Sequence, residues 1–350
     1  MTGGVGVAVV GCAHRPHAWS YARALAGSDE TRLVGVFDQS EQLGRSVADD
    51  FAAPYHDDAE ALITSPDVQA VIVCTSTVEH RGLVELAASY GRHVLCEKPI
   101  ATTLDDAEAM VGACRDAGVQ LHSAFVTRFH PLVQQLRAGL VAGDIGDLVG
   151  AVGGNRGRPP LPPQYPAWIT DPAASGGGAL MDHSVHLTDV LRHLSGREVR
   201  RVSAEVGAQL WDCGVDDLAL LSLVLEGGVV ACVDPSWSVP AGNPWDYDFF
   251  LRLVGTTGSV AVDDLAESLQ LVSNRVGGGL RLVPFGVDVD QAMIEAFAAS
   301  VRAGEVLDPC ATGEDGLRAL QVALAGYASA ATAAPVDLPI PRTPPPNDPT

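Results

Sequence analysis

The sequence predicts an α/β protein in which a doubly wound parallel sheet is followed by a second α/β domain with a large, mostly antiparallel open sheet. Two observations support this prediction. In the first 120 residues, short apolar runs alternate with helix-like stretches, the pattern of a parallel sheet covered by helices on both faces. From residue 198 to 272, strand-like runs follow one another with only turns between them, which is typical of an antiparallel sheet.

The strand-like runs of the first half are apolar throughout instead of alternating, as expected of strands buried on both faces. Gly118 follows the last helix-like stretch of this half and is suited to end it, because glycine readily adopts the left-handed conformation of a helix C-terminus. We predict strands at residues 5–10, 33–37, 70–74, 93–96 and 119–124, and helices at 17–26, 41–51, 59–64, 79–90 and 105–117.

The second half begins with a predicted helix at 131–141 and a strand at 148–153. A loop rich in proline and glycine follows at 154–178, and its length makes it a candidate substrate-facing flap. Further helices are expected at 180–194, 289–303 and 314–332. We therefore predict a nucleotide-binding domain at 1–124, a substrate-binding and oligomerisation domain at 125–334, and a poorly ordered tail at 335–350, which contains seven prolines.

Composition excludes several classes of function. A formal charge of −21 over 350 residues argues against a nucleic-acid partner, because an acidic surface repels phosphates. No apolar stretch is long enough for a membrane helix and the start has no basic leader, so we expect a cytoplasmic protein. The seven cysteines are scattered without a CxxC pair, so we expect buried free thiols and no metal site.

A weak dinucleotide fingerprint follows the first predicted strand. Gly11 stands where the tight turn into the helix needs a glycine, but Ala13 and Pro16 occupy the later glycine positions. Asp38 ends the second strand, where a carboxylate can accept hydrogen bonds from the adenosine ribose and would repel a 2′-phosphate. This pattern favours NAD over NADP. A structural turn and a solvated strand-end aspartate are the alternatives.

Three residues far apart in the sequence suit proton and hydride chemistry. Lys98, in the segment Glu97-Lys98-Pro99 at a strand end, offers a positive charge for a developing alkoxide. His186 titrates nearest to neutral pH and is a candidate base, with Asp182 one helical turn before it on the same face. Taken singly, the lysine could be a solvated turn and the aspartate a helix cap.

These motifs together resemble the glucose-fructose oxidoreductase, inositol dehydrogenase and rhizopine-catabolism family (Gfo/Idh/MocA), from about residue 5 to 330. The resemblance implies an N-terminal Rossmann domain, an open C-terminal sheet that often forms dimers or tetramers, and hydride exchange between NAD or NADP and a secondary alcohol of a sugar or cyclitol. The segments that carry the resemblance are 5–11, 36–38, 70–80, 91–99 and 176–182, followed by His186 and Asp189.

The resemblance also implies roles for individual residues. It makes Lys98, Asp182 and His186 the catalytic residues. Sugar contacts are expected from Arg128, Arg156 and Trp168, at positions that face the cleft in related chains. The cofactor-binding residues would be Gly11, Ala13, Asp38, Thr75, His80, Glu97 and Lys98.

Some positions depart from the family pattern. Thr75 begins the segment Thr-Ser-Thr-Val-Glu-His, where Thr-Pro-Asn, two residues and His are common, and Ser184 replaces a frequent glycine. Two other functions remain open. One is an enzyme of the same fold that oxidises a sugar transiently to eliminate a glycosidic substituent, and the other is a non-catalytic nucleotide-binding sensor.

Overall fold

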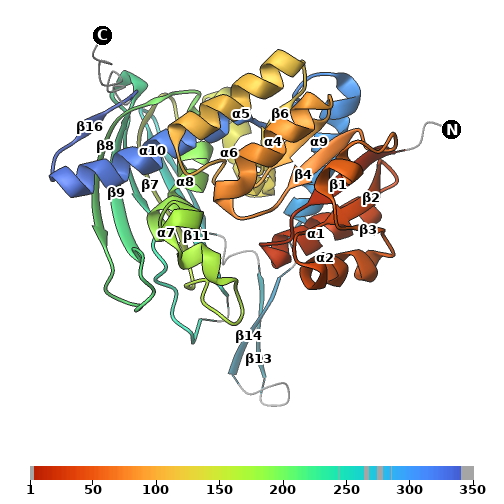
Figure 1. Ribbon diagram of the computed structural model, residues 1–350. Helices are drawn as coiled ribbons and strands as arrows, with labels where there is room; N and C mark the ends of the chain where they lie inside the picture. Colours follow the sequence, from red (N-terminus) through yellow and green to blue (C-terminus); the bar gives the residue numbers. More distant parts are fainter. Residues whose placement is uncertain (1–3, 244, 264–267, 274–278, 285, 340–350) are drawn as a thin grey trace, which may run out of the picture.

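Two seven-stranded sheets lie side by side, each with helices packed against it (Figure 1). The structure is a computed structural model that describes residues 4–243, 245–263, 268–273, 279–284 and 286–339. A two-stranded hairpin, β13 (Ser268–Ser273) with β14 (Gly279–Pro284), belongs to neither large sheet. The predicted fold class is confirmed by this arrangement.

The first sheet is parallel apart from one short edge strand. Its order is β15-β6-β5-β4-β1-β2-β3, and only the pair β15 and β6 is antiparallel. Alternate residues of the central strand serve two cores: Val7 and Val9 pack on one side, Ala8 and Val10 on the other. The strands are β1 (Val5–Val10), β2 (Thr31–Phe37), β3 (Tyr55–His56), β4 (Ala70–Val73), β5 (His93–Cys96), β6 (Leu121–Ser123) and β15 (Ala311–Thr312).

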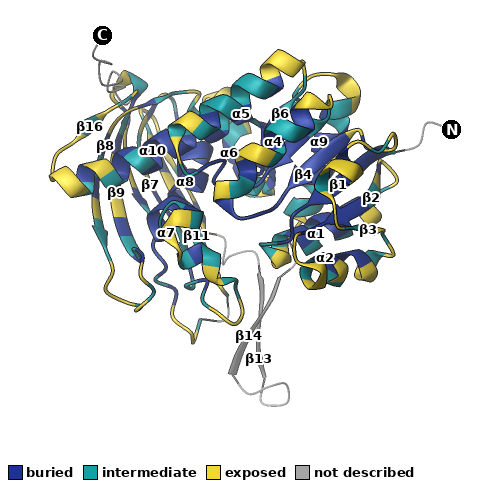
Figure 2. Ribbon diagram, viewed as in Figure 1, coloured by how far each residue is buried: buried dark blue, intermediate teal, exposed yellow. Residues whose placement is uncertain are grey.

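Helices cover both faces of this sheet, so its strands are buried (Figure 2). On one face, α9 packs against α1 and contributes to the same core. On the other face, α4 and α5 pack together. The helices are α1 (Arg15–Ala26), α2 (Glu41–Ala48), α3 (Ala59–Ile63), α4 (His80–Ser89), α5 (Leu104–Ala117) and α9 (Val289–Ala303).

The second sheet has the order β12-β11-β7-β10-β9-β8-β16 and is mostly antiparallel, as predicted. Only β7 and β10 pair in parallel. Its strands β9 and β10 alternate buried and exposed residues, because one face of the sheet carries helices and the other does not. The strands are β7 (Leu148–Gly157), β8 (Val199–Gly207), β9 (Leu218–Leu225), β10 (Val230–Asp234), β11 (Tyr247–Gly255), β12 (Ser259–Asp263) and β16 (Val336–Asp337).

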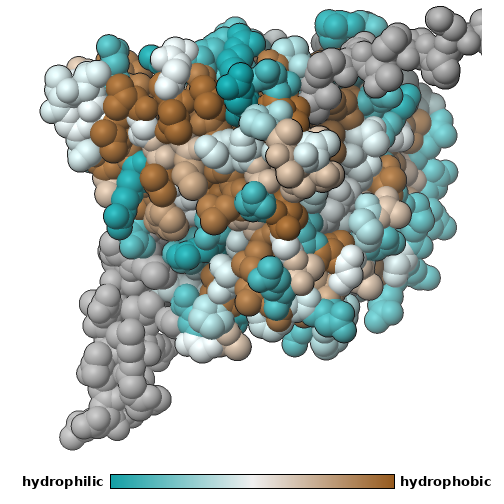
Figure 3. Space-filling model, turned by 90° about the vertical axis from the view of Figure 1, so that its left-hand side faces the viewer, coloured by the Kyte–Doolittle hydropathy of each residue, from teal (hydrophilic) through white to brown (hydrophobic). Residues whose placement is uncertain are grey.

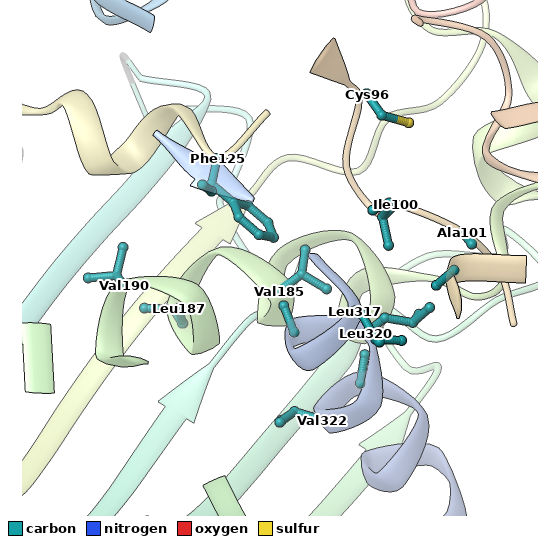
Figure 4. Packing of buried hydrophobic residues seen from close by; sticks show 14 of the residues in the cluster. Cys96, Ile100, Ala101, Phe125, Val185, Leu187, Val190, Leu317, Leu320 and Val322 are labelled. Carbon is teal, nitrogen blue, oxygen red and sulfur yellow. The ribbon is translucent and has the colours of Figure 1, made fainter. Parts of the chain in front are cut away.

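Helices α8 and α10 lie on the inner face of the second sheet and join it to the first. Figure 4 shows Val185 of α8 and Leu317 of α10 in one cluster with Ile100 and Phe125, which follow strands β5 and β6 of the first sheet. This shared core fixes the two sheets relative to each other. The helices of this half are α6 (Pro131–Ala142), α7 (Pro172–Ser175), α8 (Ala179–Ser195) and α10 (Gly313–Thr332).

The start of α8 is held by a residue from a distant loop. The carboxylate of Asp216 accepts hydrogen bonds from the backbone N–H groups of Gly178, at 2.9 Å, and Leu180, at 2.8 Å, and so supplies the missing N-cap. The hydroxyl of Tyr327 donates to the same carboxylate at 2.7 Å. A Cβ on Gly178 would meet the Asp216 carbonyl oxygen at 2.0 Å, so this approach requires glycine. The turn thereby aims the first turn of α8 at the first sheet.

Several details differ from the sequence predictions. Helix α9 and strand β15, which fall within the predicted second domain, pack on the first sheet, because the chain returns there after the hairpin. In the predicted flap 154–178, the first residues continue β7 and the last form α7. Within the predicted tail, β16 pairs with β8, while residues 340–350 lie outside the described part. The domain boundaries themselves stay a prediction.

Candidate active site

A cavity of about 390 Å³ opens between the two sheets, at the carboxyl ends of the parallel strands. Open α/β sheets bind their ligands at this edge. The loop after β1, the ends of β4 and β5, the segment 155–169, helix α8 and strand β11 all contribute to its wall. Lys98, Asp182 and His186 line it together, although Lys98 comes from the first sheet and the other two from α8.

Lys98 and Asp182 form an ion pair that crosses the cavity wall. The Lys98 Nζ lies 2.6 Å from Asp182 Oδ1 and 3.3 Å from the Asp182 carbonyl oxygen. Burial by itself would raise the pKa of Asp182, but the Lys98 ammonium and then the His183 imidazole outweigh it, so the pKa lies well below its ordinary value. Asp182 is therefore a carboxylate at neutral pH.

Two further donors hold the other oxygen of this carboxylate. The indole Nε1 of Trp237 donates to Asp182 Oδ2 at 3.2 Å, and His183 Nε2 lies 3.2 Å from the same atom. Trp237 is completely buried, packed with Ala179 and Val215. Both carboxylate oxygens of Asp182 are thus engaged by protein groups, which suits the residue to orient Lys98 more than to accept a proton.

His186 is buried and uncharged at neutral pH. Burial, followed by the positive charge of Lys98 and by His183, holds the pKa of His186 well below its ordinary value. Its ring meets Phe125 edge-on, with ring centroids 6.0 Å apart, and its buried Nδ1 has no hydrogen-bond partner. A neutral imidazole has a lone pair that can accept a proton. His186 can therefore accept a proton in the cavity.

Glu97 anchors the strand end that carries Lys98. Its carboxylate accepts hydrogen bonds from the Tyr21 hydroxyl, from the Lys98 backbone N–H at 3.0 Å and from His17 Nδ1 at 2.8 Å. Burial would raise the pKa of Glu97, but His17 and then His14 outweigh it and lower the pKa. Burial also opposes the charge on His17, yet Glu97 raises the pKa of that imidazole. The two residues form a partly buried ion pair next to Lys98.

The predicted cofactor residues divide into two groups. Thr75 and His80 line the cavity with Glu97 and Lys98, and the buried Thr75 Oγ1 and His80 Nε2 have no hydrogen-bond partner. These buried atoms are available to a polar ligand. Gly11, Ala13 and Asp38 lie outside the cavity lining, in the turn after β1 and at the end of β2.

The turn after β1 is shaped for close approach by a ligand. Gly11 has φ +94, and a Cβ there would meet Thr75 Cγ2 at 2.2 Å, so only glycine fits. The carboxylate of Asp38 receives the backbone N–H of Cys12 at 2.6 Å and that of Ser40 at 2.7 Å. Asp38 is thereby fixed beside the turn, with acceptor capacity remaining for a ribose. These residues fit a dinucleotide.

The three residues predicted to contact the sugar lie in different places relative to the cavity. Trp168 lines the cavity, and its Nε1 donates to the Ala13 carbonyl oxygen at 3.0 Å, which ties the segment after β7 to the nucleotide turn. Arg128 does not reach the cavity: it is buried in a two-pronged pair with Asp189, at 2.8 and 2.6 Å. The prediction for Arg128 as a sugar contact is therefore corrected to a structural ion pair.

Arg156, the third residue expected to contact the sugar, lies outside the cavity lining. It pairs with Asp248 and covers the ring of Phe250, and it does not line the cavity. Side chains alternate along β7, and Asn155, the preceding residue, is the one that lines the cavity. Arg156 therefore lies on the face of β7 opposite to Asn155.

The cavity contains functional candidates that the sequence analysis missed. They are His183, Arg158, Tyr165, Tyr247 and Phe249, with Trp237 behind Asp182. The alternation of strand β11 could have indicated Tyr247 and Phe249, but nothing local marks Trp237.

Among the described residues, no group of three or more His, Cys, Asp or Glu side chains could hold a metal, and no helix is long and apolar enough to cross a membrane.

Comparison with known proteins defines the class. Residues 5–125 match the model of an oxidoreductase family with an NAD-binding Rossmann fold, and residues 133–261 match the GFO/IDH/MocA C-terminal domain. The protein is thus an NAD(P)-binding oxidoreductase. It belongs to the Gfo/Idh/MocA family, as the sequence motifs indicated.

Several relatives resemble the chain over most of its length. Myo-inositol 2-dehydrogenase of Thermotoga maritima is 29% identical over 88% of this chain and 91% of its own. D-xylose 1-dehydrogenase (NADP(+)) 2 of Haloferax volcanii is 30% identical over 91% of this chain and 92% of its own. The crystal structure of a probable dehydrogenase from Thermotoga maritima superposes with a TM-score of 0.82 at 26% identity, covering 95% of this chain and 99% of that one.

Proposed function

We propose that the protein transfers hydride between NAD and a secondary alcohol or ketone of a sugar or cyclitol. The observation that carries this proposal is the ion pair of Lys98 and Asp182 beside the uncharged His186 in one cavity. Relatives named as inositol and xylose dehydrogenases support the substrate class. The fixed turn at Gly11 and the unsatisfied atoms of Thr75 and His80 support the cofactor.

Each residue has a distinct role in this mechanism. A bound nicotinamide supplies or accepts the hydride. The Lys98 ammonium stabilises negative charge on the reacting oxygen, and His186 accepts the hydroxyl proton during oxidation. Asp182 holds the ammonium in position, since both of its oxygens already accept hydrogen bonds. In the reverse direction, His186 passes a proton taken up from solvent to the oxygen.

NAD is the proposed cofactor because of Asp38. Its carboxylate is fixed by the backbone of Cys12 and Ser40, at the end of β2 where an adenosine ribose binds in this fold. A 2′-phosphate at that place would meet a like charge. Calorimetric titration should therefore show binding of NAD at least about tenfold tighter than that of NADP, a difference of about 1.4 kcal/mol. Equal affinities would contradict this assignment.

The proposed activity can be tested with a substrate panel. The purified protein is mixed with NAD and each of a series of sugars and cyclitols, and the absorbance of reduced nicotinamide is followed. We expect turnover with at least one member and its loss in Lys98→Met, while Arg115→Met, at an exposed site distant from the cavity, retains it. Failure to bind NAD at millimolar concentration would overturn the proposal, and so would unchanged turnover in Lys98→Met.

The same assay separates the two alternative functions. An oxidation-elimination enzyme would hold NAD tightly and release many products per cofactor without net reduction. A non-catalytic sensor would bind NAD, yet give no turnover with any sugar or cyclitol.

We further propose that the protein forms a dimer or tetramer through the open face of its second sheet. Four residues on neighbouring strands, Val254, Val152, Val230 and Leu220, are about half exposed on the face directed away from α8. Figure 3 shows hydrophobic residues gathered on the side of the molecule where this sheet lies. A patch of this kind is typical of an interface. Light scattering after size-exclusion chromatography should give a multiple of 36.4 kDa, and Val230→Lys should lower it.

A further inference from the structure

The charged side chains that line the cavity are already paired with one another or with a neighbour. Lys98 is paired with Asp182, at 2.6 Å, and His17 with Glu97, at 2.8 Å. The remaining arginine of the wall is Arg158, whose Nη1 lies 2.6 Å from Oδ1 of Asp246, just outside the cavity. Arg158 Nη2 also donates to the backbone carbonyl oxygens of Ala241, at 3.2 Å, and Asn243.

Three imidazoles of the wall, those of His14, His80 and His186, add no positive charge at neutral pH. Burial, followed by His17, lowers the pKa of His14 to about 3. Burial also lowers the pKa of His80, and it lowers that of His186 well below its ordinary value. A negatively charged substrate would therefore meet Lys98 and Arg158 only as members of ion pairs, although Arg158 Nε is buried without a hydrogen-bond partner.

Uncharged aromatic groups make up another part of the wall. Trp168, Tyr165, Tyr247 and Phe249 line the cavity. Aromatic rings present broad apolar faces, which match the C–H face of a sugar or cyclitol ring, while their polar tips can reach hydroxyl groups. These rings offer no positive charge to compensate the loss of hydration of a carboxylate or phosphate.

We propose that the site selects uncharged polyols and rejects sugar acids and sugar phosphates, and that Asp246 sets this selectivity by occupying Arg158. The inference rests on the proposed function and narrows its substrate class. The net charge of −21 acts in the same direction, because it repels anions before they reach the cavity. Removing the carboxylate of Asp246 would leave the Arg158 guanidinium free to bind an anion.

Matched pairs of substrates test the selectivity. The pairs are D-glucose with D-glucuronate, D-galactose with D-galacturonate, and myo-inositol with myo-inositol 1-phosphate. We expect kcat/KM for each neutral compound that is oxidised to exceed that of its charged partner at least about a hundredfold, or 2.7 kcal/mol. Comparable or higher values for a charged partner would overturn the inference and leave the proposed function intact.

A binding experiment gives a readout that does not depend on turnover. Each compound is titrated into the complex with NADH while the cofactor fluorescence is followed. Tighter binding of D-glucuronate than of D-glucose would overturn the inference. If no compound of any pair bound or reacted at 100 mM (about a thousandfold above a typical 0.1 mM KM), the proposed function would fail and the inference with it.

Two variants examine the role of Asp246 directly. Asp246→Asn unpairs Arg158 at an exposed position, and we expect it to raise kcat/KM for D-glucuronate at least fivefold, with less than a twofold change for D-glucose. Asp248→Asn is the matched control, because Asp248 pairs with Arg156 outside the cavity. An equal effect of both variants, or none from Asp246→Asn, would show that Asp246 does not set the selectivity.

Discussion

Replacing Trp237 by phenylalanine tests how firmly the fold holds Asp182. The substitution keeps an aromatic ring but removes the indole N–H that donates to Asp182 Oδ2 at 3.2 Å. His183 would remain the donor on that oxygen, and Lys98 the donor on the other. The carboxylate would then turn more freely, and its control over the position of the Lys98 ammonium would weaken.

The structure indicates the size of the effect. A hydrogen bond to a charged group contributes about 1.5–3 kcal/mol. Trp237 is fully buried, so the smaller ring also leaves a cavity that costs about 1 kcal/mol more. We therefore expect Trp237→Phe to lower the free energy of unfolding by about 2.5–4 kcal/mol. Trp211→Phe is the control: it loses a hydrogen bond of 2.9 Å to the Trp237 carbonyl oxygen, which is uncharged, and should cost about 0.5–1.5 kcal/mol.

Urea unfolding of both variants measures these differences. Kinetic measurements with a substrate from the panel then distinguish a misplaced Lys98 ammonium from a less stable fold. Trp237→Phe should reduce kcat about tenfold with little change in KM, because a misplaced ammonium stabilises the transition state less. The acid limb of its pH profile should move upward, since the carboxylate of Asp182 loses a donor. Equal stability losses in the two variants, or an unchanged kcat and pH profile in Trp237→Phe, would refute the reasoning.

Three other predictions concern the nucleotide turn, a buried ion pair and pH. Gly11→Ala should weaken NAD binding at least about tenfold by calorimetry, because of the positive φ and the contact with the strand β4 end, whereas Gly82→Ala, with open space around it, should bind NAD normally. Arg128→Met should cost about 3–5 kcal/mol in urea unfolding, since it leaves Asp189 buried and unpaired, but should not change KM for the substrate. Burial lowers the pKa of His122 from 6.5 to about 3, so its neutral form stabilises the fold above pH 6.5 and this contribution is lost as the pH falls towards 3. At pH 5 the loss is about 2 kcal/mol, and unfolding at pH 5 and pH 8 should show a pH dependence smaller by that amount in His122→Gln. An equal pH dependence in both proteins would contradict the last prediction.

Local pattern was sufficient to predict most of the architecture. The buried runs of β1 and β4 are apolar along their whole length, as expected of strands covered on both faces. The short edge strands of the two sheets were predicted less well. Strand β15 and strand β16 are two residues each, too short to leave a periodic signal, and they exist because the chain returns to a sheet edge formed elsewhere.

The three catalytic candidates could be named from sequence because each lies in a compact motif. Arg128 and Arg156 show the limit of that method. The family resemblance made both plausible sugar contacts. In the structure, Arg128 pairs with the buried Asp189, and Arg156 lies on the face of β7 that does not line the cavity. Neither the ion-pair partner, 61 residues away, nor the face of the strand is written in the local sequence.

The sequence by itself therefore determined the fold class, the family and the residue types for hydride chemistry, because apolar periodicity and short motifs are local properties of the chain. Only the tertiary structure decided how those residues act. It brought Lys98 within 2.6 Å of Asp182, 84 residues later, and it placed Trp237 and His183 on the second carboxylate oxygen. These contacts are set by the packing of α8 between two sheets, which depends on the whole core and on no single segment.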